Sequence, residues 1–152
     1  MTDREMPSTT FSAFYEDEMP GQVRRATILT GDPDTAHDLV HDAFVEVYRR
    51  WESLAEAGPY LNRAVLNRCR DHARTTRRRA ARLPLFLPDA TAPEHDLFDA
   101  VQALPFNHRA AIVLRYHYQF TEAEIAAVLS CRPGSVGPWL QRGLRRLRKD
   151  LS

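Results

Sequence analysis

Apolar residues recur at spacings of three and four along most of the chain, a period typical of amphipathic α-helices. The clearest stripe begins after Asp32, a predicted N-cap, with Pro33 at the first helical position. Its members are Ala36, Leu39, Val40, Ala43, Phe44, Val47, Tyr48 and Trp51. A helix over residues 10–29 is predicted before it and one over residues 58–79 after it. Three such helices can close a small bundle.

The second half of the chain carries shorter helical patterns. Residues 97–104 and 107–118 each predict a helix, and Thr121 with Glu124 forms a capping box at the start of another. A last helix begins at Pro133 after a tight turn. Its residues predicted to face inward are Val136, Leu140, Leu144, Leu147 and Leu151. Two helices joined by such a turn are typical of a helix-turn-helix.

The sequence therefore predicts an all-α protein with two domains. Residues 83–93 contain three prolines and no helical period, so we expect them to link the domains. The first domain would cover residues 11–82, after a flexible tail at 1–10, and the second 94–152. We expect no further domain after the second.

The charges lie in blocks along the chain. Residues 1–56 carry five arginines against 12 acids, and residues 57–88 carry eight arginines against one acid. Residues 89–128 carry two arginines against six acids, and residues 129–152 carry six cations against one acid. Two basic zones, each following an acidic one, indicate two surfaces for a polyanion on a protein that does not bind polyanions indiscriminately.

The first basic zone combines polar, aromatic and arginine side chains on one predicted helix. The mixture that can stack unpaired bases while tracking a nucleic-acid backbone is given by Tyr60 and the following Arg63, Asn67, Arg68, Arg70 and Arg74. Trp51 lies on the apolar stripe of the preceding helix, so we expect it in the core of the first bundle.

Composition excludes several other classes of protein. No stretch is long and apolar enough to span a membrane, and Asp3 and Glu5 lie where a secretory signal would be basic and then apolar. We therefore expect a cytoplasmic protein that does not bind a membrane. Cys69 and Cys131 lie far apart without CxxC spacing, so we expect packed thiols, not a disulfide or zinc ligands.

Two histidines suggest an alternative chemistry. His37 and His41 lie four residues apart, share a helix face and could chelate zinc beside an acidic neighbour, as in a metallohydrolase. The sequence offers no third ligand, and the rest of this helix is ordinary amphipathic sequence. We therefore expect no metal, no cofactor and no enzymatic activity.

Ordered motifs over nearly the whole chain resemble the extracytoplasmic-function sigma factors, the smallest members of the sigma-70 family. They lie at residues 30–32, 38–44, 60–67, 103–105, 108–110, 114–116 and 121–126. The resemblance implies a bundle of the region 2 type linked to a helix-turn-helix domain of the region 4 type. It also implies binding to core RNA polymerase, promoter recognition and opening of the DNA at the −10 element.

The resemblance also implies roles for individual residues. The beta-prime coiled coil of polymerase would bind Asp38, Leu39, His41, Asp42 and Phe44. The −10 element would meet Tyr60, Arg63, Asn67, Arg70 and Arg74. The −35 element would meet Ser135, Gly137, Trp139, Gln141, Arg142, Arg145 and Arg146. The beta flap and an anti-sigma factor are further implied partners.

The last helix departs from the family pattern. Residues 137–139 are Gly-Pro-Trp where the family usually carries Lys, Ser and Arg. Arg132 is a poor N-cap, and Pro138 inside a helix costs on the order of 3 kcal/mol. Of the usual base-contacting positions only Gln141 and Arg142 keep good donors. The resulting hypothesis is a sigma factor with altered or relaxed −35 specificity.

Two alternatives to a working sigma factor remain at this point. One is a helix-turn-helix regulator that binds DNA without polymerase, which co-purification with core polymerase would distinguish. The other is a degenerate sigma homologue that acts by sequestering an anti-sigma factor, which reconstituted transcription would distinguish.

Overall fold

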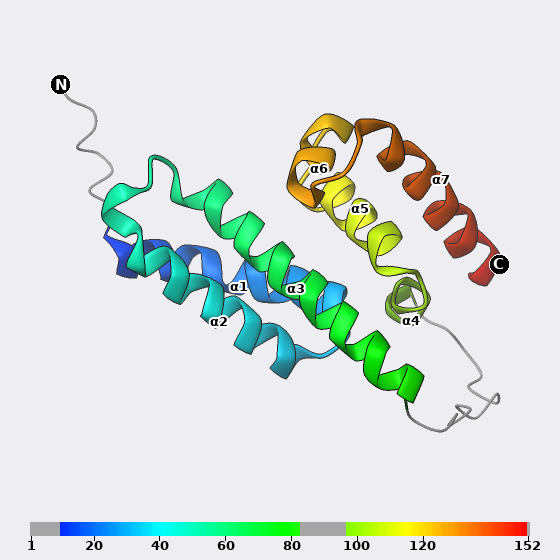
Figure 1. Cartoon of the computed structure of the whole chain (residues 1–152), viewed down its shortest axis with the longest axis horizontal. Helices are drawn as coiled ribbons and strands as arrows, with labels where there is room; N and C mark the ends of the chain where they lie inside the picture. Colours follow the sequence, from blue (N-terminus) through cyan, green and yellow to red (C-terminus); the bar gives the residue numbers. More distant parts are fainter. Residues whose placement is uncertain (1–9, 83–96, 152) are drawn as a thin grey trace.

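The computed structural model describes residues 10–82 and 97–151, and within these ranges every regular element is a helix (Figure 1). The helices are α1 (Phe11–Thr30), α2 (Pro33–Arg49), a 3-10 turn η2 (Trp51–Ser53), α3 (Ala57–Arg82), α4 (Leu97–Gln102), α5 (Phe106–Tyr116), α6 (Glu122–Leu129) and α7 (Pro133–Asp150). The predicted all-α fold is confirmed. The predicted linker and nearly all of the predicted tail lie outside the described residues.

Local capping explains where α1 ends and α2 begins. Gly31 follows α1 in the left-handed conformation, with a φ of 85°, and its backbone N–H donates to the Thr27 carbonyl oxygen at 2.7 Å. The Asp32 carboxylate then accepts from the Thr35 backbone N–H at 3.0 Å, with Pro33 in the first turn. The predicted N-cap of α2 is therefore confirmed.

The first three helices bury a shared apolar core. Phe44 of α2 is 1% exposed and packs edge-on or tilted against Phe11, Phe14 and Tyr15 of α1. Trp51 joins the same aromatic cluster, with its ring centroid 5.4 Å from that of Phe11. Trp51 is only partly buried and packs against the core from its edge, so the prediction that it is a core residue holds in part.

The second half contains the predicted helix-turn-helix, formed by α6 and α7. Thr121 and Glu124 make both hydrogen bonds of the capping box, and Ser130 adopts the left-handed conformation with a φ of 54° after α6. Helix α7 then continues through Pro138. Leu140 and Leu147 face inward as predicted, whereas Leu151 is 47% exposed, so its predicted inward position is wrong.

Gly143 takes an inward position on α7 that the leucine pattern did not predict. It is buried against α5, where an added Cβ would meet the Ile112 Cδ1 at 2.7 Å. The absence of a side chain lets α5 and α7 approach closely at this point.

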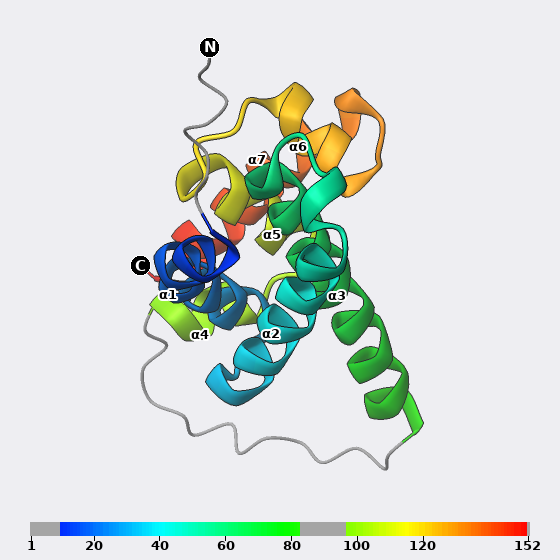
Figure 2. The ribbon, with the colours of Figure 1, turned by 90° about the vertical axis from the view of Figure 1, so that its left-hand side faces the viewer.

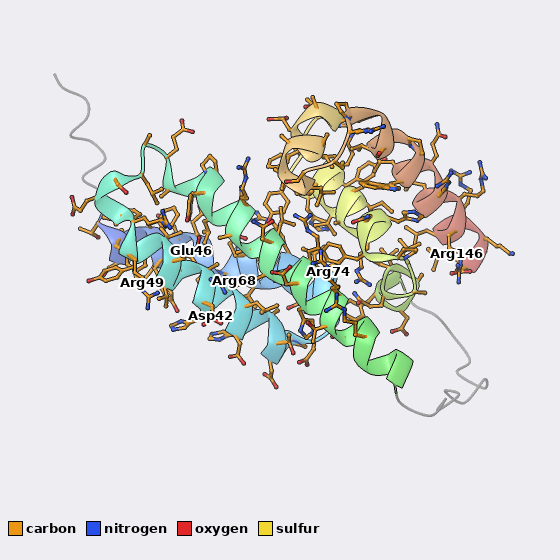
Figure 3. All side chains as sticks on the ribbon, viewed as in Figure 1. Asp42, Glu46, Arg49, Arg68, Arg74 and Arg146 are labelled. Atoms are coloured by element: carbon orange, nitrogen blue, oxygen red, sulfur yellow. The ribbon has the colours of Figure 1, made fainter. Side chains whose placement is uncertain are left out.

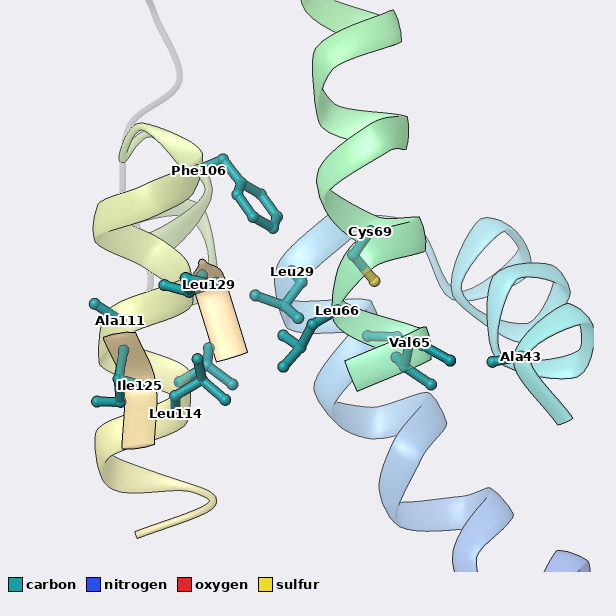
Figure 4. Packing of buried hydrophobic residues seen from close by; sticks show 14 of the residues in the cluster. Leu29, Ala43, Val65, Leu66, Cys69, Phe106, Ala111, Leu114, Ile125 and Leu129 are labelled. Carbon is teal, nitrogen blue, oxygen red and sulfur yellow. The ribbon is translucent and has the colours of Figure 1, made fainter. Parts of the chain in front are cut away.

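The two halves pack against each other through a continuous apolar core. Helices α4 and α5 lie beside α1, and α6 lies beside α3 (Figure 2). Apolar side chains of α5 and α6, including Leu114 and Leu129, face those of α1 and α3, including Leu29 and Leu66 (Figure 4). No helix in the described part of the chain is both long and apolar enough to cross a bilayer.

Candidate polymerase and nucleic-acid interfaces

The outer face of α2 carries most of the residues predicted to bind polymerase. The apolar stripe of α2 packs against the core. Asp38, His41 and Asp42 lie on the opposite side of the helix and are exposed. Leu39 is half-buried at the edge of this face. Phe44 is buried in the core, so it cannot contact polymerase directly and can only pack beneath the exposed residues of α2.

The face of α3 brings together the five residues predicted for the −10 element. Tyr60, Arg63, Asn67, Arg70 and Arg74 recur at spacings of three and four, which places them on one stripe of the helix. Arg63, Asn67 and Arg74 are exposed. The Arg70 guanidinium is half-buried and donates to the Asn67 Oδ1 at 2.9 Å and to the Leu129 carbonyl oxygen at 3.1 Å.

Tyr60 is held in place by a carboxylate of α2. Its hydroxyl donates to the Glu46 Oε2 at 2.5 Å, and the Arg68 guanidinium donates to the Glu46 Oε1 at 3.0 Å (Figure 3). The hydrogen bond from Tyr60 and the ion pair with Arg68 hold the pKa of Glu46 below its ordinary value. The bond to Glu46 raises the pKa of Tyr60.

Sequence reasoning missed the roles of Glu46 and Arg68. Arg68 belongs to the first basic zone by sequence, yet its guanidinium pairs with Glu46 of α2, the same carboxylate that accepts from Tyr60. The spacing of residues within one helix cannot show a pairing between two helices.

The reading face of α7 divides into an exposed basic half and a less exposed first half. Arg142, Arg145 and Arg146 are exposed, as is Gln141. The Arg146 Nε donates to the Asp150 Oδ2 at 3.0 Å, an ion pair within the last turns of the helix. The residues predicted for the first half are half-buried: Ser135, Gly137 and Trp139.

Helix α6 also borders the reading face. A Cβ placed on Gly137 would lie 3.3 Å from the Glu122 Oε1, so this carboxylate lies beside the first half of α7. Among the described residues, no three His, Cys, Asp or Glu side chains are arranged to hold a metal ion. Among the residues predicted to contact DNA, the exposed side chains are arginines and amides.

Comparison with known proteins identifies the family. Residues 14–79 match Sigma-70 region 2, and residues 95–147 match Sigma-70, region 4. The RNA polymerase sigma-E factor of Streptomyces avermitilis is 32% identical over 156 residues, which cover 93% of this chain and 84% of that protein. The chain belongs to the sigma-70 family, among its extracytoplasmic-function sigma factors. It is a sigma factor of transcription initiation.

Other relatives agree with this assignment. The sigma-E factor of Streptomyces antibioticus is 35% identical to this sigma factor over 138 residues, covering 81% of this chain and 74% of that protein. The sigma factor CarQ of Myxococcus xanthus is 31% identical over 129 residues, covering 76% of this chain and 74% of that protein.

Two solved structures share the fold. The sigma factor RpoE of Bartonella quintana, solved with the anti-sigma factor NepR, superimposes with a TM-score of 0.71 at 20% identity, covering 91% of this chain and 94% of that chain. CnrH, solved with the cytosolic domain of CnrY, gives a TM-score of 0.64 at 20% identity, covering 91% and 85%. The likeness confirms the helical fold of a two-part sigma factor.

Proposed function

We propose that this sigma factor binds core polymerase through the exposed face of α2 and holds the opened −10 element on the stripe of α3. The stripe carries the proposal, because five polar, aromatic and basic residues share one face beside the helix-turn-helix. Guanidinium groups bind phosphates, and the Tyr60 ring is suited to an unstacked base. Tyr60 is fixed by Glu46, which reduces the side-chain freedom lost on binding.

The acidic face of α2 suits a basic or polar protein partner. Asp38 and Asp42 lie one turn apart and are both exposed. The expected partner is the beta-prime coiled coil, and the beta flap is the expected contact of the second half. With these partners, the protein is expected to act in the cytoplasm. A protein inhibitor of the anti-sigma type is a further expected partner.

A co-purification experiment tests the polymerase contact. The double variant Asp38→Asn and Asp42→Asn is expected to lose most of its binding to core polymerase, whereas Asp17→Asn, an exposed acid on α1, is expected to bind normally. Normal binding by the double variant would contradict the proposed surface. Failure of the unaltered chain to bind polymerase would instead favour a helix-turn-helix regulator that acts alone.

Run-off transcription tests the −10 contact. With core polymerase and a promoter whose −10 element is already mismatched, Tyr60→Ala is expected to lose less activity than on the fully paired promoter. The reason is that a pre-opened duplex does not need an aromatic ring to hold the base out of the stack. Equal losses on both templates would contradict a role in opening. Polymerase binding without any transcription from the unaltered holoenzyme would favour the sequestration alternative.

The −35 readout is proposed to be relaxed. Gly137 and Trp139 are half-buried, and Pro138 has no side-chain donor, so Gln141 and Arg142 are the exposed donors nearest the middle of α7. Selection of upstream promoter sequences by the holoenzyme is expected to give a weak consensus. A sharp consensus over the whole −35 element would contradict this proposal.

A further inference from the structure

A cavity of about 550 Å³ lies between α3 and the helix-turn-helix, and the proposed promoter contacts account for only some of the residues that line it. Its volume falls in the range of roughly 300–1,000 Å³ that is common for small-molecule sites. One wall is α3, and the other is formed by the start of α5, the end of α6 and α7. Arg74, on the side of α3 that faces the second half, lies at this junction (Figure 3).

The cavity is strongly basic. Arg70, Arg74 and Arg78 line it from three successive turns of α3, and none of the described residues that line it is acidic. Arg74 lies 4.0 Å from Asp71, and both side chains are more than half exposed, so this pair neutralises little of the charge. Guanidinium groups at this density suit a ligand with more than one phosphate group.

The opposite wall supplies a different kind of contact. Trp139 of α7 lines the cavity, with Asn107 and Ser130 as hydrogen-bonding neighbours. An indole can stack on a planar base, and an amide and a hydroxyl can bond its edge. Helix α5 also begins at this wall without a side-chain cap or an acid in its first turn, so its free N–H groups add to the positive potential.

We propose that this cavity binds a nucleotide carrying a polyphosphate chain. The phosphates contact the three arginines of α3, and the base lies against Trp139. Because the ligand touches both halves, its binding stabilises their packed arrangement over any arrangement in which they separate. Arg70 and Arg74 also belong to the stripe proposed for the −10 element, so the nucleotide and the opened promoter strand compete for them.

Tryptophan fluorescence of the full chain, without polymerase or DNA, tests the proposal. The chain has two tryptophans, and Trp51 lies in the aromatic core of the first bundle. The substitution Trp51→Phe therefore leaves Trp139 as the single reporter beside the cavity. Titration with ATP and GTP at constant ionic strength is expected to change the emission of Trp139 in a saturable manner, and calorimetry on the unaltered chain gives the affinity independently.

Matched variants and ligands define the outcome. The double variant Arg74→Gln and Arg78→Gln, at exposed positions, is expected to weaken nucleotide binding about tenfold or more, whereas Arg63→Gln, on α3 outside the cavity, changes it less than about twofold. Inorganic tripolyphosphate is expected to bind more weakly than ATP, and adenosine not to saturate. The proposal is overturned if no nucleotide binds, if Arg63→Gln weakens binding equally, or if tripolyphosphate binds as tightly as ATP.

Discussion

The Arg70 guanidinium donates a hydrogen bond of 3.1 Å to the backbone carbonyl oxygen of Leu129, which lies 59 residues further along the chain. Leu129 is the last residue of α6, and carbonyl groups at the end of a helix have no partner within it. A cation is also favoured at this end by the helix dipole. Arg70, a residue of the proposed −10 stripe, therefore links the helix-turn-helix to the first bundle through this hydrogen bond.

A second polar link between the halves is buried. Gln22 of α1 is 0% exposed, and its side-chain amide donates to the Asn62 Oδ1 at 2.6 Å. The Tyr118 hydroxyl donates to the Gln22 Oε1 at 3.2 Å, and the Arg25 guanidinium lies 4.3 Å from the centroid of the Tyr118 ring. The amide of Gln22 is thus satisfied by one residue from each half.

Removal of the Tyr118 hydroxyl tests this link. The substitution Tyr118→Phe leaves the buried Gln22 Oε1 without its donor, which we expect to lower the free energy of unfolding by about 1–2 kcal/mol. Urea unfolding followed by circular dichroism measures it. Tyr116→Phe, at a side chain 58% exposed, is the control and is expected to change stability by less than about 0.5 kcal/mol. Equal effects of the two substitutions would contradict a specific role for Tyr118.

The cost of Tyr118→Phe should depend on pH. Burial raises the pKa of Tyr118 to about 12, against an ordinary value of 10.0. Between these values the unfolded chain loses the phenolic proton while the folded chain keeps it, so this tyrosine contributes stability below pH 10.0 that is lost as the pH rises towards 12. Phenylalanine has no such proton.

The stability difference between the unaltered chain and Tyr118→Phe is therefore expected to shrink above pH 10.0. Urea unfolding at several alkaline pH values measures the difference. Burial likewise raises the pKa of Cys69 to about 12, but this thiol is present in both proteins, so its contribution cancels. A difference that stays constant or grows with pH would contradict the burial of the Tyr118 hydroxyl.

Capping signals and apolar periodicity predicted the helices well because both are local. The Asp32 cap and the capping box of Thr121 and Glu124 depend on residues three positions apart. Which residue fills an inward position depends on the neighbouring helix. Gly143 faces inward because α5 comes close to α7 there, and a pattern of leucines cannot show this.

For the candidate site too, the sequence predicted the features that depend on one helix and missed those that depend on two. The stripe of α3 and the exposed face of α2 follow from helical spacing. Three other features depend on contacts between different helices. They are the burial of Phe44 under the α2 face, the hydrogen bond of Tyr60 to Glu46 and the hydrogen bond of Arg70 to Leu129. Helical spacing orders the residues on one helix and carries no information on which helices meet.

Gly31 is expected to resist substitution at the junction of α1 and α2. Its φ of 85° costs an L-residue about 1–2 kcal/mol. An added Cβ would also lie 2.7 Å from the Gln102 Oε1, whose amide donates to the Ile28 carbonyl oxygen. We expect Gly31→Ala to lower the free energy of unfolding by at least about 1 kcal/mol in thermal or urea melts.

Gly58 provides the matched control for Gly31. It lies in the first turn of α3, and an added Cβ would meet nothing within 4 Å. Gly58→Ala is expected to leave stability unchanged or to raise it by up to about 1 kcal/mol, since alanine loses less conformational freedom on folding. A similar loss at both glycines would show that the left-handed conformation is not the cause.

Pro138 lies inside α7 and removes the hydrogen bond that its backbone N–H would make to the Gly134 carbonyl oxygen. We expect Pro138→Ala to raise the free energy of unfolding by about 1–3 kcal/mol. Pro133→Ala is the control, because proline at the first helical position loses no helical hydrogen bond. Thermal melts of both variants measure the effect, and no gain from Pro138→Ala would mean that α7 adapts to the proline without cost.

The exposed arginines of α7 should contact phosphates without reading sequence. Arg145 is exposed to solvent, whereas Arg146 forms an ion pair with Asp150. If Arg145 neutralises one phosphate, Arg145→Gln lowers the slope of log affinity against log salt by about 0.9. Fluorescence anisotropy of the full chain on upstream duplexes, repeated over a series of salt concentrations, measures this slope.

The loss caused by Arg145→Gln is expected to be equal on promoter and random duplexes, because a phosphate contact carries no base information. Arg24→Gln, at an exposed position on α1, is the control and should leave the slope unchanged. Gln141→Ala is expected to act in the opposite manner, with a preserved slope and a loss confined to the preferred sequence. A loss for Arg145→Gln on the promoter duplex alone would assign this arginine to base recognition instead.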